Sequence, residues 1–136
     1  MLQPTSTGLL TCRFAAFLEI RRRNARYFRE RFGDDERFIL QGENGESSWF
    51  SFTMIVRPGC GLTRRRVFEA LRAAAIDFRI ITGGNFLRHD VIRHFDYDVH
   101  GSRNADLAHD NGFFVGNYAS DLTGEIDHLW RTLRDL

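Results

Sequence analysis

A long amphipathic helix near the start of the chain limits the folds open to this sequence more than any other feature. Its apolar residues recur at spacings of three, four and seven, which places them on one helical face. Gly33 and the two aspartates after it end the pattern. We expect this helix to extend past the body on which it packs, or to cover with its apolar face something outside the chain. The residues on that face are Leu10, Phe14, Phe17, Leu18, Ala25, Phe28 and Phe32.

The remainder of the chain alternates short strand and helix patterns. Aromatic and β-branched runs bounded by glycine and proline predict strands, and amphipathic runs behind a capping residue predict helices. With short links between them, these elements predict an α+β fold, a two-layer domain. Its helices pack on a mostly antiparallel sheet of three to four strands. The predicted strands are residues 37–41, 48–56, 77–81 and 112–118; the helices run from Thr63 to about Ala75, from Ser102 or Asn104 to about Asn111, and from Thr123 onward, with one or two irregular helical turns over residues 87–94.

The length of 136 residues suits one domain. Residues 1–6 are polar and contain Pro4, so we expect a disordered or extended N-terminus followed by a single α+β domain over residues 7–136. The sequence contains no long apolar run, and its first residues do not have the pattern of a secretory signal, so we expect none. We expect both cysteines, Cys12 and Cys60, to be free thiols of a cytoplasmic protein.

The chain contains no lysine, because all 19 basic residues are arginine. Arginine is never deprotonated at ordinary pH, so no side chain here can form a Schiff base or serve as a P-loop lysine. The net charge of +1 gives no strong field for nucleic acid or an anionic membrane, and we expect neither as a partner.

Two polar clusters have both a functional and a structural interpretation. His94, Asp96, Asp98 and His100 would share one face of an extended segment and could ligate a divalent metal, but Gly101 follows and a solvated loop is the favoured interpretation. The arginines of residues 21–31 could hold phosphates, but acidic residues lie on the same helix, which favours a solvated face.

Two segments that join apolar residues to glycine and asparagine are the best candidates for a site: residues 82–90 and residues 111–118. Asn85, Arg88 and His89 follow a pair of glycines in the first, and Arg79 lies on the strand before it. Arginine and asparagine suit phosphate, carboxylate or sugar hydroxyls, and His89 could serve as a base or a donor. A capped turn with a surface histidine is the alternative, and spacing alone does not decide between them.

The order of these motifs resembles a known family. Residues 79–86 read Arg-Ile-Ile-Thr-Gly-Gly-Asn-Phe and resemble the arginine-containing strand and Gly-Asn turn of nucleotide-sugar dehydrases. These are the pyridoxamine-phosphate-dependent 3-dehydrases that belong with the DegT/DnrJ/EryC1/StrS sugar aminotransferases, which are fold-type I PLP enzymes. Residues 17–27 resemble the long helix that links the two domains of that family. Further matches follow in the same order at residues 46–52, 95–97, 104–106 and 112–117.

The resemblance implies that this chain is a C-terminal small domain without the large, cofactor-binding domain. It implies a part of a PLP/PMP-dependent nucleotide-sugar dehydrase or aminotransferase for surface-polysaccharide (deoxysugar) biosynthesis, catalytically silent alone and with no cofactor bound to this chain. It assigns Arg79, Asn85, Arg88 and His89 to substrate binding, no residue to catalysis or metal, and a homodimer to the full-length enzyme. A non-enzymatic dimerisation or interaction module is the alternative.

Overall fold

A computed structural model of the chain describes residues 6–81 and 83–136, with side chains from residue 14 on. It confirms the predicted α+β class, with helices packed on a four-stranded antiparallel sheet. In chain order the elements are α1 (Ser6–Phe32), β1 (Phe38–Leu40), β2 (Ser51–Val56), α2 (Arg64–Ala73), β3 (Arg79–Ile80), η1 (Phe86–Arg88), η2 (Asp90–His94), α3 (Arg103–Asn111), β4 (Gly112–Gly116) and α4 (Thr123–Arg134).

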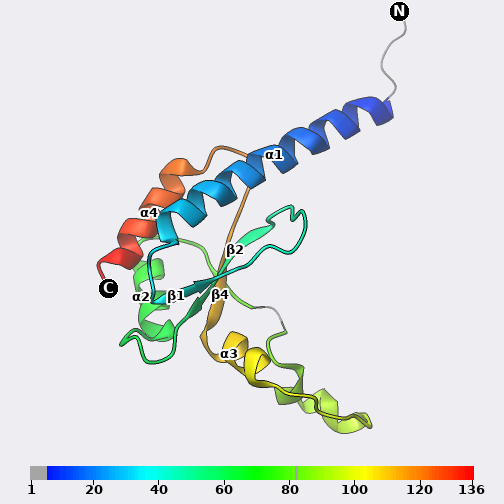
Figure 1. Ribbon diagram of the computed structural model, residues 1–136, viewed down its shortest axis with the longest axis vertical. Coiled ribbons are helices and arrows are strands. Elements are labelled where there is room, and N and C mark those ends of the chain that lie inside the picture. The colour runs from blue at the N-terminus through cyan, green and yellow to red at the C-terminus, as the bar shows by residue number, and fades with distance from the viewer. Residues whose placement is uncertain (1–5, 82) are drawn as a thin grey trace, which may run out of the picture.

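Of the α1 side chains that the structure describes, those buried in the body lie in the C-terminal half of the helix. Ala25, Phe28 and Phe32 are buried there, whereas the side chains of Phe14 and Phe17 are 67% and 49% exposed. Figure 1 shows the N-terminal turns running beyond the sheet and the other helices. The expectation that this helix extends past the body is confirmed, and the periodic face that predicted it is only partly covered by described residues.

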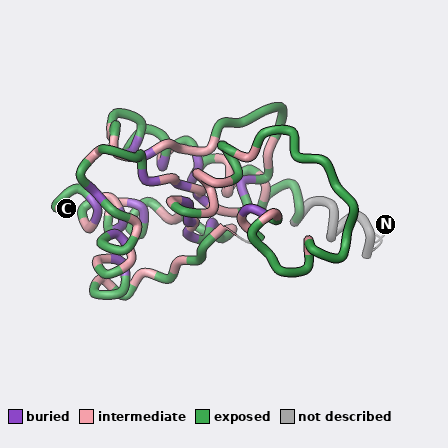
Figure 2. Tube along the Cα trace, turned by 90° about the horizontal axis from the view of Figure 1, so that it is seen from below, coloured by how far each residue is buried: buried purple, intermediate pink, exposed green. Residues whose placement is uncertain are grey.

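The sheet has the order β1-β2-β4-β3, and every neighbouring pair is antiparallel. Along β2, Phe52 and Met54 are buried against the helices, while Thr53 between them points to the opposite face, as strand alternation requires. The ring of Phe52 stacks on that of Phe28 in α1 at 4.5 Å between centroids. Figure 2 shows most of the buried positions gathered in the interior of the molecule.

Several predicted element boundaries were wrong. The strand expected from residue 48 begins at Ser51, because Trp49 adopts a left-handed backbone with φ of 48°. The last helix is not capped by Thr123; Leu122 is its N-cap residue, and the Asp121 carboxylate accepts the Thr123 N–H at 3.1 Å. Thr63 does cap α2, accepting the Arg66 N–H at 3.3 Å.

The other predicted boundaries differ at the element ends. The strand expected over residues 77–81 contains only Arg79–Ile80, and that of residues 112–118 ends at Gly116. Helix α2 ends at Ala73, since Ala75 has a positive φ of 55°.

Some sequence predictions fall on residues that the structure does not describe. The N-terminal tail was predicted over residues 1–6; Ser6 instead begins α1, and residues 1–5 lie outside the described part, as do Thr82 and the side chains of Leu10 and Cys12. Cys60 is a free thiol, as expected. Among the described helices, none combines the length and the apolar composition needed to span a bilayer.

Candidate functional site

The predicted site residues lie in and beside one excursion of the chain, residues 83–111, between β3 and β4. This excursion leaves the sheet at the opposite end from the free part of α1 (Figure 1). Asn85, Arg88 and His89 lie together in and next to η1, whereas Arg79 lies on the preceding strand. The structure therefore brings three of the four residues into one cluster and places the fourth on β3.

The excursion begins with a turn that requires glycine. Gly83 and Gly84 have φ of 78° and 52°, a backbone region that other residues rarely adopt. A Cβ on Gly84 would also collide with the His109 imidazole. The diglycine thus allows the backbone to pass close against α3, and this contact fixes where Asn85 starts η1.

Asn85 is buried, and the protein uses most of its hydrogen-bonding capacity. Its Oδ1 accepts the Leu87 N–H at 3.0 Å, and its Nδ2 donates to Asp106 Oδ1 at 2.9 Å. The main-chain N–H of Asn85 donates to His109 Nδ1 at 3.1 Å. The capped-turn interpretation of this asparagine therefore holds, and Asn85 shapes the cluster more than it presents a free group.

Arg88 is paired with two aspartates of α3. Its Nη1 and Nη2 donate to the two oxygens of Asp110 at 2.6 and 3.0 Å, and its Nε donates to Asp106 Oδ1 at 3.0 Å. Hydrogen bonds from Asn85 and Ser102, and then Arg88, hold the pKa of the Asp106 carboxyl below its usual value. An anion that binds Arg88 would have to compete with these carboxylates.

Within the described part of the chain, His89 has a hydrogen-bond partner at Nε2 and none at Nδ1. Its Nε2 lies 2.6 Å from the Gly83 carbonyl oxygen, and its ring stacks on Phe86 at 5.8 Å between centroids. A carbonyl oxygen only accepts, so Nε2 carries the proton of the neutral ring and Nδ1 can accept from a hydroxyl. The side chain is exposed, so such a hydroxyl can reach it.

Arg79 is the cation of the predicted set with no acidic partner among residues 6–81 and 83–136. It pairs with Phe114, which pairs with Thr53, so its side chain belongs to the sheet face that α1, α2 and α4 do not cover. The residue is exposed. Its guanidinium is therefore available for a phosphate or carboxylate of a ligand.

Sequence reasoning missed the residues of α3 that hold the cluster together. Asp106, His109 and Asp110 all contact residues of the turn or η1. They are three and four positions apart, which places them on one side of a helix. That spacing predicts a shared helical face from the sequence alone. It does not predict a role for this face, because the packing of Asn85 and Arg88 against the helix is visible only in the structure.

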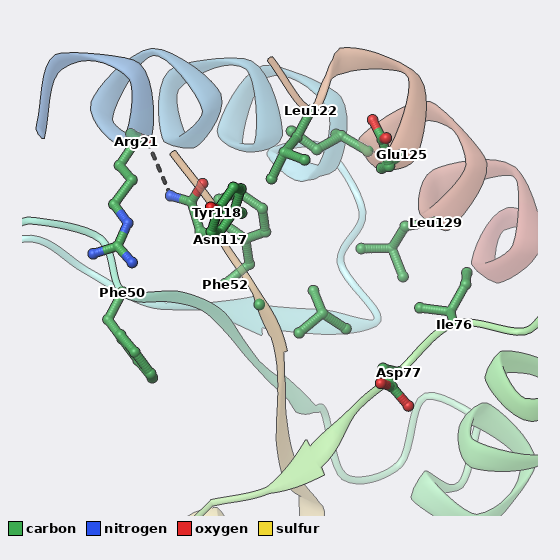
Figure 3. Close-up of a pocket in the computed structure, with 13 residues that line it drawn as sticks. Arg21, Phe50, Phe52, Ile76, Asp77, Asn117, Tyr118, Leu122, Glu125 and Leu129 are labelled. Carbon is green, nitrogen blue, oxygen red and sulfur yellow. Dashed lines mark hydrogen bonds between the residues drawn. The ribbon is translucent and has the colours of Figure 1, made fainter. Parts of the chain in front are cut away.

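The second Gly-Asn segment has a structural task that the sequence did not reveal. Asn117 is buried, and its Nδ2 donates to the carbonyls of Trp49 at 2.8 Å and Arg21 at 3.0 Å. Its Oδ1 accepts from Asn24 Nδ2 at 3.1 Å. Figure 3 shows Asn117 below α1 with its bond to the Arg21 main chain. The amide ties α1 to the sheet, so it is not a free binding group.

The two polar clusters lie at the surface of the molecule. Residues 94, 96, 98 and 100 are exposed, and no group of three or more potential metal ligands occurs within the described ranges. Among the arginines of α1, Arg22, Arg26 and Arg31 pair with acidic side chains. These three arginines are thus neutralised by acidic side chains, whereas the Nε of Arg21 is covered.

Comparisons with known proteins identify what the chain is similar to. It is 43% identical over 120 residues to GDP-4-keto-6-deoxy-D-mannose 3-dehydratase of Escherichia coli O55:H7 (strain CB9615 / EPEC), a match that covers 87% of this chain and 31% of that protein. The solved E. coli GDP-4-keto-6-deoxy-D-mannose-3-dehydratase with bound hydrated PLP superposes with a TM-score of 0.87 at 41% identity, covering 93% of this chain and 33% of the other. No family model matches the chain.

A more distant structure shows the fold alone. The sugar aminotransferase CalS13 from Micromonospora echinospora has a TM-score of 0.68 at 12% identity, covering 87% of this chain and 30% of that one. Together the comparisons confirm the predicted resemblance to PLP-dependent nucleotide-sugar 3-dehydratases of the DegT/DnrJ type. The chain spans about a third of the length of the relatives it matches, which fits a C-terminal domain.

Proposed function

We propose that this chain is the C-terminal domain of a PLP/PMP-dependent nucleotide-sugar dehydratase or aminotransferase that makes deoxysugars for surface polysaccharide. The observation that carries the proposal is the similarity to a GDP-4-keto-6-deoxy-D-mannose 3-dehydratase, at 43% identity across 31% of that enzyme's length. The substrate is then a nucleotide-linked 4-keto-6-deoxysugar, and the domain is cytoplasmic and part of a homodimer.

Within this domain, Arg79, Asn85, Arg88 and His89 serve the substrate in different ways. Arg79 supplies an exposed cation, without an acidic partner among the described residues, for a diphosphate or carboxylate. His89 offers Nδ1 to a sugar hydroxyl. Asn85 and Arg88 hold the turn on α3, so their contribution is to place His89 and the backbone around it.

This chain has no side chain that could attach PLP covalently. PLP enzymes that attach the cofactor do so through lysine, and none is present. The cofactor supplies the electron sink for the reaction when it is bound, so the chemistry depends on residues outside this chain. The domain alone is therefore expected to be catalytically silent.

Catalytic silence can be tested on the chain alone. Incubation with pyridoxal phosphate followed by borohydride should leave no adduct on any side chain, and GDP-4-keto-6-deoxy-D-mannose should not be consumed. Mass spectrometry of the tryptic peptides locates any modification. An adduct trapped on an internal residue would contradict the proposal, as would turnover.

The role of Arg79 can be tested in a hybrid enzyme, the E. coli O55:H7 relative with its matching third replaced by this chain. Arg79→Gln should raise KM for the nucleotide sugar about tenfold or more with a smaller change in kcat, because a charge-assisted contact contributes about 1.5–3 kcal/mol. Arg66→Gln is the matched control, since Arg66 is also exposed but lies on α2, which packs on the opposite face of the sheet. Equal KM values for the two variants would show that Arg79 does not bind the substrate.

One observation favours the alternative function, a dimerisation or interaction module. Phe14 and Phe17 are exposed on the part of α1 that extends past the body. Sedimentation of the full chain distinguishes the two functions. A dimer that the Phe17→Ser substitution converts to a monomer would support the interaction module. A monomer at high concentration argues against it.

A further inference from the structure

A mostly apolar groove lies between α4, the ends of β2 and β4, and the segment before β3. Its cavity volume is about 430 Å³, within the range of small-molecule sites. Figure 3 shows Leu122 and Leu129 on the α4 side, Phe50 and Phe52 on the sheet side, and Ile76 at the far end. The residues of the candidate substrate site, Arg79 and the excursion over residues 83–111, are not among its walls.

Arg21 of α1 stands at one end of this groove, with its guanidinium directed toward Phe50 (Figure 3). Its Nε is covered and has no hydrogen-bond partner among the described residues. The guanidinium carbon lies 5.8 Å from the centre of the Phe50 ring, within the range of a cation–π contact. A covered N–H without an acceptor is costly, so an acceptor brought by a ligand would gain more here than at a hydrated arginine.

The other end of the groove carries the opposite charge. Asp77 and Glu125 line it, and both are exposed and hydrated. An anionic head group is repelled from that end and attracted to Arg21. The charges therefore orient an elongated ligand, with its head at Arg21 and its apolar body along Leu122, Leu129 and Ile76.

From this arrangement we infer that the groove binds a small amphipathic carboxylate, a molecule with one carboxylate and an aliphatic or aromatic body. The planar fork of Arg21 matches a carboxylate through Nε and one Nη, after a small rotation of the side chain that uncovers Nε. The apolar walls supply the remaining affinity by burying the body. This site does not depend on the proposed enzymatic function, because no residue assigned to substrate takes part.

Isothermal titration of the full chain with decanoate, below its micelle concentration, tests the inference. Saturable binding with one molecule per chain is expected. Decanol, which has the same body without the charge, should bind at least about tenfold more weakly. Methyl chemical-shift changes should fall on Leu122 and Leu129, which locates the ligand.

Two variants give the test its control. Arg21→Gln should weaken decanoate about tenfold or more and leave decanol unchanged, whereas Arg29→Gln, an exposed arginine on the same helix, should change neither. Asp77→Asn should not weaken decanoate. The inference is overturned if decanoate fails to saturate, if Arg21→Gln binds it as wild type does, or if decyltrimethylammonium binds more tightly than decanoate.

Discussion

The buried amide of Asn24 gives the sharpest stability prediction, for the variant Asn24→Ala. Its Nδ2 donates to Asn117 Oδ1 at 3.1 Å and to the carbonyls of Tyr118 and Ser120 at 3.2 and 2.7 Å. Its Oδ1 accepts the Leu122 N–H at 3.4 Å. One side chain of α1 thus fixes the whole connection between β4 and α4.

The magnitude follows from the groups that alanine leaves without partners. Asn117 Oδ1 is buried and the Leu122 N–H half-buried, and each such group costs about 1–3 kcal/mol, which gives about 2–6 kcal/mol in total. The carbonyls of Tyr118 and Ser120 belong to exposed residues and can bind water instead, so they add little.

Urea unfolding followed by circular dichroism measures this loss as a lower midpoint with an unchanged slope. Arg26→Ala is the matched control on the same helix, because Arg26 is exposed and only pairs with Glu19 at 3.1 Å. We expect about 0–1 kcal/mol for it. If Asn24→Ala loses less than about 1 kcal/mol, the argument from unpaired groups is refuted.

The variant Asn24→Asp tests whether the donor character of the Asn24 side chain, and not its size, determines its contribution to stability. It has the same shape, but at pH 7 a carboxylate oxygen would replace Nδ2 and face three acceptors. We therefore expect Asn24→Asp to be at least as unstable as Asn24→Ala at that pH and to regain stability when it is protonated. Wild-type stability for the aspartate variant at pH 7 would contradict the assigned orientation of the amide.

Two further predictions concern the excursion. The pKa of Asp106 is lowered in the folded state, so the stability that this carboxylate contributes is complete above its unfolded pKa of about 3.9 and is lost as pH falls through the folded pKa. Asp106→Asn should therefore have a lower melting temperature than wild type at pH 7, and this difference should shrink below pH 4. A difference that stays constant with pH would contradict the linkage. Gly83→Ala should cost about 1–2 kcal/mol of stability because of its positive φ alone. Gly84→Ala should cost more, because the added Cβ at residue 84 also meets the His109 side chain. Equal losses for the two variants in urea unfolding would show that His109 moves aside without a cost.

Periodic and local signals made most of the fold predictable. The apolar face of α1, the alternation in β2 and the Thr63 cap are encoded within a few residues of each element. The strand start at Ser51 was not predictable in this way, because the left-handed backbone of Trp49 goes with the burial of its side chain in the core. The cap at Leu122 depends on Asn24, which is far away in sequence.

The candidate site was less predictable, because its polar residues satisfy one another across long sequence separations. Asn85 and Arg88 looked like free binding groups until their bonds to Asp106 and Asp110 were visible. Arg79 remains available because its strand lies at the sheet edge and faces away from the helices. No pattern along the chain distinguishes a paired arginine from an unpaired one.

Turnover by the hybrid enzyme tests the central claim most directly. The comparison is between the E. coli O55:H7 relative, the same protein without its matching third, and the hybrid in which this chain fills that place. The account predicts that GDP-4-keto-6-deoxy-D-mannose is dehydrated by the hybrid and not by the shortened protein or by this chain alone. A folded hybrid that binds PLP but has no activity with any nucleotide-linked 4-keto-6-deoxysugar, or an active isolated chain, would contradict it.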